Sequence, residues 1–172
     1  MLARSGRPAE ALDLIDLLPV SDDEIDGMTY ARAIVLGLAG RAEEGRTELT
    51  ERLEQRSDSA SLLNAICWVS GLHELVLDDT LDYCTRGIER SGNPANVLDS
   101  RAMVHFRRGD MSAALEDIDA ALKLNPELAA SRYLRGVILL AMGDDSGNDQ
   151  VQMALRQAPE LKDHYALYGI KP

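Results

Sequence analysis

The side chains of this 172-residue chain that could do chemistry are three histidines and two cysteines. His73, His105 and His164 lie far apart and follow no metal-ligand spacing such as HExxH. We therefore expect core or edge histidines rather than ligands or general bases. Cys67 and Cys84 match no zinc pattern and are too few for a disulfide scaffold. Two reduced thiols in a helical core are the favoured interpretation, and a single disulfide is the alternative.

One short stretch has the beginnings of a calcium loop, with Asp144, Ser146 and Asn148 at alternate positions. An EF-hand loop needs glycine at its sixth position and glutamate at its twelfth. This chain has Asp149 and Leu155 there. We interpret the stretch as a turn between two helices, and we expect no metal and no cofactor.

The triplet Arg108-Gly109-Asp110 could suggest adhesion, and the neighbouring Phe106-Arg107 could suggest nucleic acid. Arg107 and Arg108 are the only adjacent basic pair, and the net charge is -11 with a pI near 4.6. Such a field repels a phosphate backbone. No nucleic-acid partner is therefore expected. The glycine spacing described below instead favours a short turn for the triplet, with Asp110 as the N-cap of the next helix.

No apolar run in the sequence reaches about 18 residues, the length that a membrane-spanning helix needs. No membrane insertion is expected, and the start of the chain predicts no signal peptide. A soluble protein of the cytoplasm, or of the periplasm as part of a longer exported protein, remains open. Arginine outnumbers lysine 15 to 3, which favours a GC-rich bacterial genome.

The elements that would position these residues are indicated by glycines at a fixed period. Gly6 and Gly40 are 34 residues apart, as are Gly109 and Gly143, while Gly40 and Gly109 are 69 apart. Each glycine follows an apolar stretch and precedes an acidic, alanine-containing one. A period of this length predicts a helix–turn–helix unit that is repeated along the chain.

The best single unit runs from Ala95 to Leu128. It contains small residues where two helices would approach closely and bulky ones where they would fill the gap between hairpins. The pattern reads Leu98-x2-Arg101-Ala102-x2-His105, then Ala114-x3-Ile118, then Ala121 and Pro126. This unit resembles the tetratricopeptide repeat family, and the resemblance extends over nearly the whole chain. It implies an all-α, right-handed superhelix of antiparallel helix–turn–helix hairpins.

The neighbouring units carry the same pattern less completely. In the second unit we align Ala65-x2-Trp68 with Ala102-x2-His105 and Thr80-x3-Cys84 with Ala114-x3-Ile118, which requires about three extra residues near "GLHELVLDD". We expect one domain, 1–172, with a partial repeat at 1–20, repeats at 22–57, 58–94, 95–128 and 129–159, and a capping helix at 160–172. The expected helices are 8–18, 22–38, 41–55, 60–72, 78–91, 95–108, 111–124, 127–142, 146–157 and 160–168.

The two ends of the chain carry further expectations. Gly6 would occupy the interhelix turn of a repeat whose first helix is reduced to Leu2, Ala3 and Arg4. This favours a fragment of a longer protein over an N-terminal cap at 8–18. The pattern Ser21-x-x-Glu24 predicts a capping box at the start of the second helix.

Arginines recur at one position of the repeat. Arg32, Arg101 and Arg135 stand where the family often has leucine. We favour a physical reason for this recurrence: each guanidinium forms a fork with a carboxylate on a nearby second helix, such as Asp117 or Asp119. We therefore interpret these arginines as members of structural ion pairs rather than as ligand-binding residues.

The resemblance also implies a binding surface, because in this family the first helices of successive hairpins line a concave groove. The lysines and asparagines with which some relatives grip a C-terminal carboxylate are missing at the aligned positions. Most of the groove set is apolar, with Tyr30, Phe106 and Tyr133 as expected anchors and Arg107 as a polar selector. The set is Tyr30, Ile34, Leu38, Leu62, Ile66, Val69, Asp99, Met103, Phe106, Arg107, Tyr133, Val137 and Leu140.

The expected function is that of a protein-interaction scaffold that binds a peptide or helix of a partner in this groove. It would act by equilibrium docking, and no enzyme activity is expected. The alternative is a C-terminal accessory segment of a larger multidomain enzyme, with its groove packed on the catalytic domain. Self-association through exposed repeat ends is a further alternative.

Overall fold

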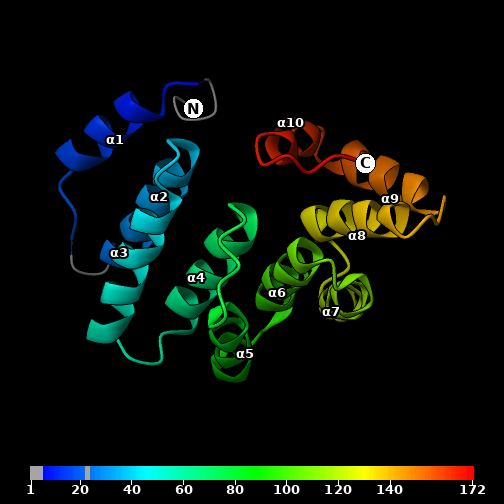
Figure 1. Ribbon diagram of the computed structural model, residues 1–172, viewed down its shortest axis with the longest axis horizontal. Coiled ribbons are helices and arrows are strands. Elements are labelled where there is room, and N and C mark those ends of the chain that lie inside the picture. Colours follow the sequence, from blue (N-terminus) through cyan, green and yellow to red (C-terminus); the bar gives the residue numbers. More distant parts are fainter. Residues whose placement is uncertain (1–5, 22–23) are drawn as a thin grey trace.

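The computed structural model describes residues 6–21 and 24–172, and within them the chain forms ten helices and no strand. The helices pack as successive hairpins, α2 with α3, α4 with α5, α6 with α7 and α8 with α9, which stack into a curved array (Figure 1). The predicted Leu2–Arg4 remnant lies outside the described residues. The bounds are α1 Pro8–Leu17, α2 Ile25–Leu38, α3 Ala42–Gln55, α4 Ala60–Leu72, α5 Thr80–Arg90, α6 Ala95–Arg108, α7 Met111–Leu124, α8 Ala129–Ala141, α9 Gly147–Gln157 and α10 Leu161–Ala166.

The periodic glycines lie in the predicted turns. Gly6, Gly40, Gly109 and Gly143 all have φ between 76° and 82°, a left-handed conformation that favours glycine. After the last three of these, the next backbone N–H donates to a carbonyl five residues earlier, the bond of a Schellman motif. Gly109 therefore belongs to a helix–helix turn. Asp110 is the N-cap of α7, but its carboxylate accepts from Arg108 Nε at 3.2 Å rather than from the backbone of α7.

The second hairpin has the same turn without the glycine. Glu74 has φ 61°, and Leu75 N–H donates to the carbonyl of Ser70, five residues earlier, at 2.8 Å. Glu74 stands 34 residues after Gly40 and 35 before Gly109. It therefore occupies the position of the periodic glycines, although a left-handed conformation is uncommon for glutamate.

This turn corrects the alignment of α4, which was wrong by two residues. Seven residues before Glu74 stands Cys67, and not Ala65. The second hairpin contains one extra residue rather than about three, and that residue lies between Glu74 and Gly109. The residues that share the position of Cys67, each seven before its turn residue, are Ala33, Ala102 and Gly136.

Small residues permit the close approach of the paired helices. A Cβ on Gly136 would lie 2.7 Å from the carbonyl oxygen of Gly147, and one on Gly45 would lie 2.8 Å from the Cα of Ala33. Real Cβ atoms do not approach other heavy atoms this closely. The glycines at these helix contacts are therefore required by packing.

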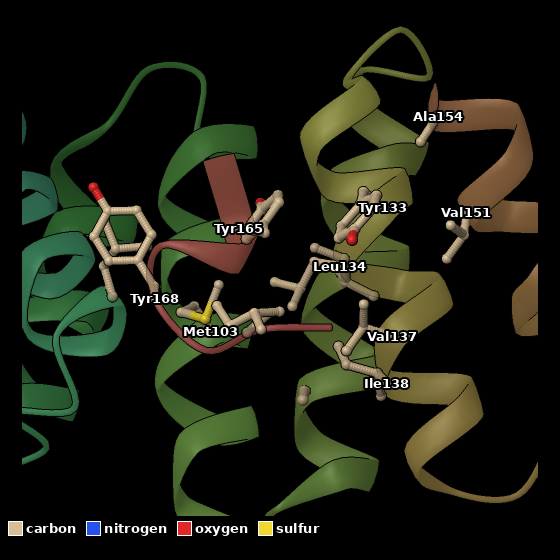
Figure 2. Close-up of a cluster of buried hydrophobic side chains, with 14 residues drawn as sticks. Met103, Tyr133, Leu134, Val137, Ile138, Val151, Ala154, Tyr165 and Tyr168 are labelled. Atoms are coloured by element: carbon tan, nitrogen blue, oxygen red, sulfur yellow. The ribbon is translucent and has the colours of Figure 1, made fainter. Parts of the chain in front are cut away.

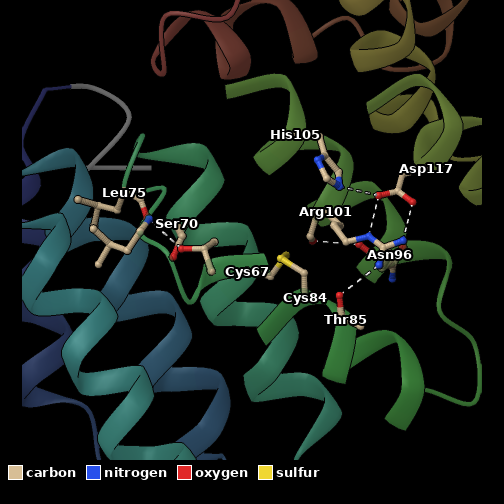
Figure 3. Close-up of a disulfide and its surroundings, with 12 residues drawn as sticks. Cys67, Ser70, Leu75, Cys84, Thr85, Asn96, Arg101, His105 and Asp117 are labelled. Atoms are coloured by element: carbon tan, nitrogen blue, oxygen red, sulfur yellow. Dashed lines mark hydrogen bonds and ion pairs between the residues drawn. A yellow bond between two sulfur atoms is a disulfide. The ribbon is translucent and has the colours of Figure 1, made fainter. Parts of the chain in front are cut away.

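The predicted arginine forks are present. Arg101 binds Asp117 through two bonds of 2.8 Å, from Nε and from Nη2 (Figure 3). Arg135 Nε donates to Asp119 Oδ1 at 2.6 Å, and Arg32 Nε donates to Glu48 at 3.0 Å. Each arginine on a first helix thus reaches a carboxylate sixteen residues away on a second helix, and this joins α2 to α3, α6 to α7 and α7 to α8.

The cysteines form a disulfide, so the favoured prediction of reduced thiols is wrong. Cys67 of α4 and Cys84 of α5 are both fully buried and bonded to each other (Figure 3). The physical reason is positional, since Cys67 and Cys84 stand where Ala102 and Ile118 stand in the next hairpin, and these positions lie at the contact of the two paired helices. The bond joins the two helices of one hairpin.

The remaining local predictions concern turns and termini of helices. Glu24 accepts from the backbone N–H of Ser21 at 3.3 Å, which is one half of a capping box, and α2 begins at Ile25. Ser146 N–H donates to Asp144 Oδ1 at 2.9 Å in the turn before α9, as expected for an interhelix turn. Across the residues that the structure describes, no helix combines the length and apolarity needed to cross a bilayer.

Candidate functional site

The concave side of the array is hollowed at two adjoining cavities. One, of about 310 Å³, lies between α2 and α4. The other, of about 290 Å³, is bounded by α2, α4, α6, α8 and α10. Tyr30, Asn64 and Trp68 line both cavities. The two cavities therefore form a continuous hollow, which we call the concave groove.

An aromatic pair stands at the middle of this groove. Tyr30 is 37% exposed and comes from α2, while the half-buried Trp68 comes from α4. Burial raises the pKa of Tyr30, although a hydrogen bond with the Trp68 side chain opposes the rise. Two aromatic faces held by packed helices make a rigid apolar platform on which a ligand could lie.

A buried carboxylate lies beside the platform. Asp99 of α6 is 9% exposed and hydrogen-bonds Ser131 of α8, and no described residue is a partner of its Oδ1. Burial raises the pKa of Asp99 to about 6. Asn64 adds a second buried oxygen without a partner, Oδ1 of its amide. The groove therefore holds two hydrogen-bond acceptors that the protein itself leaves unused.

The charges at the groove are of one sign. Among the described residues that line the two cavities there is no lysine and no arginine, whereas Asp26 and Asp99 are present. Asp26 is already paired, at 2.7 Å with Arg52 and at 3.3 Å with Arg56. Within the described part of the chain, Asp99 is thus a groove carboxylate without a lysine or arginine partner.

The C-terminal residues 161–172, which we call the C-terminal segment, cover another part of the concave side. Tyr165 stacks on Tyr133 with ring centroids 4.9 Å apart and planes at 4° (Figure 2). Both rings are buried, and the Tyr165 hydroxyl donates to the carbonyl of Ala130 at 3.4 Å. Tyr133 therefore packs against the chain itself and not against solvent.

Arg107 anchors the end of the same segment. Its Nη2 donates to the carbonyl of Tyr168 at 2.6 Å, its Nε to the carbonyl of Gly71 at 3.1 Å, and its Nη1 to Glu74 at 2.7 Å. The ring of Tyr168 also lies edge-on to His73, with centroids 5.1 Å apart. The guanidinium of Arg107 is thus engaged inside the protein, where we expected a polar selector.

The pKa of His73 follows from these surroundings. Burial, with the positive charge of Arg107 beside it, lowers this pKa to about 4. His73 is neutral at ordinary pH, in line with the expected core or edge role.

Three members of the predicted groove set line the cavities, namely Tyr30, Leu62 and Asp99. By exposure, Tyr30 is the exposed member of the set. Half-buried positions are held by Ile34, Leu38, Phe106, Arg107 and Leu140. The buried members are Leu62, Ile66, Val69, Asp99, Met103, Tyr133 and Val137.

Two groove residues, Asn64 and Trp68, were missed because the alignment of α4 was wrong by two residues. With Glu74 taken as the turn residue, Asn64 falls in the position of Tyr30, and Trp68 falls in the position of Ile34. The signal available in the sequence was the 69-residue interval between Gly40 and Gly109, which Glu74 divides into 34 and 35. An asparagine does therefore stand in the groove, contrary to the alignment from sequence.

No family model and no curated protein matches this sequence. Solved structures of MamA, a tetratricopeptide-repeat protein, share its architecture. MamA AMB-1 has 16% sequence identity and a TM-score of 0.57, covering 95% of this chain and 94% of that chain. MamA MSR-1 has 16% identity and a TM-score of 0.55, covering 95% and 91%. The predicted all-α, tetratricopeptide-like fold is confirmed.

Proposed function

We propose that this protein is an interaction scaffold that binds a segment of a protein partner in its concave groove. The observation that carries the proposal is the groove around Tyr30 and Trp68, where a partly exposed aromatic platform adjoins buried acceptors that have no partner among the described residues. The mechanism is equilibrium docking, without bond chemistry. The tetratricopeptide-like fold, which presents a concave surface along its first helices, supports a binding role.

The size of the groove suits an extended peptide. Cavities of about 310 and 290 Å³ are each at the lower limit of a small-molecule pocket, and they lie in line across successive helices. An extended chain places side chains alternately toward and away from such a surface. Tyr30 and Trp68 would then act as binding hot spots, because aromatic residues in a partly enclosed site contribute a large share of interface energy.

The proposal is tested by selecting a displayed random peptide library on the whole protein and measuring the affinity of the enriched peptides. Trp68→Ala is expected to weaken binding by about 10-fold or more, the effect of truncating a hot-spot aromatic. Tyr83→Ala is the matched control, because Tyr83 is a half-buried tyrosine of α5 that packs with Arg46 and Arg86 away from the groove. Peptides that bind Trp68→Ala and wild type equally would place the binding surface elsewhere.

We also infer an oxidising compartment from the Cys67–Cys84 bond. Structural disulfides persist in exported proteins and are rare in the cytosol. Of the two compartments that the sequence leaves open, the periplasm is favoured. Alkylation of the freshly extracted protein, followed by mass measurement, checks this, since two alkylated thiols without prior reduction would refute it.

A further inference from the structure

Four positions on the concave side are equivalent in successive first helices. Each lies ten residues before the left-handed turn residue that follows its helix, Gly40, Glu74, Gly109 or Gly143. Equivalent positions in stacked hairpins face the same side and form a row. The row is Tyr30 of α2, Asn64 of α4, Asp99 of α6 and Tyr133 of α8.

Three members of this row have a buried polar atom without a hydrogen-bond partner. These atoms are Asn64 Oδ1, Asp99 Oδ1 and the Tyr133 hydroxyl oxygen. An unpaired buried polar group costs about 1–3 kcal/mol. Such groups are rare in folded proteins, and a donor from a ligand can satisfy those that border a cavity.

The middle two positions are the ones that border a cavity, and their Oδ1 atoms are themselves buried. Tyr165 covers Tyr133, whereas Asn64 and Asp99 line the same cavity as Tyr30 and Trp68. Both Oδ1 atoms are acceptors, so the missing group must be a donor. At Asp99 the acceptor is also a carboxylate that no described lysine or arginine pairs with, in a protein of net charge -11.

The arginines closest to Asp99 in sequence cannot supply that cation. Arg101 is held by both oxygens of Asp117, and Arg107 is held by Glu74 and by backbone carbonyls. Around Asp99, the residues that share its cavity contribute amide, hydroxyl, imidazole and aromatic groups but no lysine or arginine within the described part of the chain.

We propose that the groove selects a peptide carrying a lysine or arginine, whose cationic group donates to Asp99 Oδ1. This inference rests on the proposed peptide-binding function and names its ligand class. The aliphatic stem of the cationic residue lies against Trp68 and Tyr30, because long basic side chains cover apolar surface while their charged ends reach a polar partner. Asn64 Oδ1 accepts from a second donor of the same peptide.

The distance between the two donors follows from the stacking. Packed helices lie about 8–10 Å apart, and an extended chain rises about 3.3 Å per residue. Donors about three residues apart therefore reach α4 and α6 together. The expected consensus is a basic residue with a polar donor side chain about three positions away.

The test uses the same displayed random peptide library, selected in parallel on wild type, on Asp99→Asn and on Asp13→Asn. Asp13 is an exposed residue of α1, so the last variant removes one negative charge far from the groove. Wild type and Asp13→Asn are expected to enrich a basic residue at a fixed position, and Asp99→Asn is expected to lose that enrichment. For a synthetic consensus peptide, Asp99→Asn should weaken binding by about 10–100-fold, the effect of a hydrogen bond to a charged group.

A norleucine replacement in the peptide separates charge from shape. The norleucine peptide should bind wild type and Asp99→Asn within about twofold, because its stem still packs on Trp68 while nothing donates to residue 99. Enriched peptides that need Trp68 but show no basic residue, or a basic preference that Asp99→Asn leaves intact, would overturn this inference and leave the peptide-binding function standing. If no peptide is enriched on wild type, the peptide-binding function falls as well.

Discussion

The free energy of unfolding should depend on pH through Asp99, and Asp99→Asn should reveal how strongly. Folding raises the pKa of this carboxyl from 3.8 to about 6, chiefly because burial disfavours its charge. The folded protein therefore holds the proton more tightly than the unfolded chain does. Burying the ionised carboxylate lowers the free energy of unfolding. This penalty is absent below about pH 3.8, develops as the pH rises, and is complete above about pH 6. One pKa unit corresponds to about 1.4 kcal/mol, so the full penalty is about 3 kcal/mol.

An amide at position 99 has no such penalty. We expect Asp99→Asn to be more stable than wild type by up to about 3 kcal/mol at pH 7, with the difference vanishing near pH 4. Urea unfolding followed by circular dichroism, at intervals from pH 4 to pH 8, measures the difference directly. Subtracting Asp13→Asn, measured in parallel, removes the general effect of one fewer charge. A stability difference between Asp99→Asn and wild type that is constant from pH 4 to pH 8 would refute the reasoning. An Asp99→Asn protein that is less stable than wild type at pH 7 would refute it as well.

Four further predictions concern stability. Replacing Cys67 and Cys84 together with alanine should cost about 3 kcal/mol, because the disulfide closes a loop of 17 residues in the unfolded chain. Gly136→Ala should cost about 1–3 kcal/mol, because its Cβ would lie 2.7 Å from a backbone oxygen of the paired helix. Arg101→Met should cost about 3 kcal/mol, because Asp117 is buried and would lose its cation. Arg135→Met should cost less than about 1 kcal/mol, because the carboxylate of Asp119 is half-exposed.

The controls for these predictions come from the same chain. Gly92→Ala should be nearly neutral, because no atom lies within 4 Å of its Cβ position. Unfolding by urea serves for all of the variants. Equal costs for Arg101→Met and Arg135→Met would contradict the role of burial. A cysteine-free protein as stable as wild type would mean that the disulfide contributes nothing to the folded state.

The fold was predictable because its signals are local and periodic. Gly40, Gly109 and Gly143 mark the turns, and the small residues at Ala102 and Ala114 mark the close contact of paired helices. The arginine forks were predictable too, since Arg101 and Asp117 occupy fixed positions in one repeat. Such features follow from the geometry of a single hairpin, which a 34-residue pattern encodes.

The errors arose where one hairpin departs from the pattern or where distant parts of the chain meet. Glu74 replaces the turn glycine, and this hid the true register of α4 and with it Trp68 and Asn64. The register error also obscured the facing positions of Cys67 and Cys84. The burial of Tyr133 depends on Tyr165, more than thirty residues later, and no repeat pattern records that contact.

The return of the C-terminal segment to Arg107 and His73 has a consequence for how the protein unfolds. In most repeat arrays each hairpin contacts only its neighbours, so the ends fray independently and stability is a sum of local terms. Here the carbonyl of Tyr168 is held by Arg107, and the same guanidinium holds the end of α4, so the last residues are tied to the second hairpin. Opening the C-terminal end breaks bonds in the middle of the array, so we expect the segment from α4 to the C-terminus to unfold as one cooperative unit.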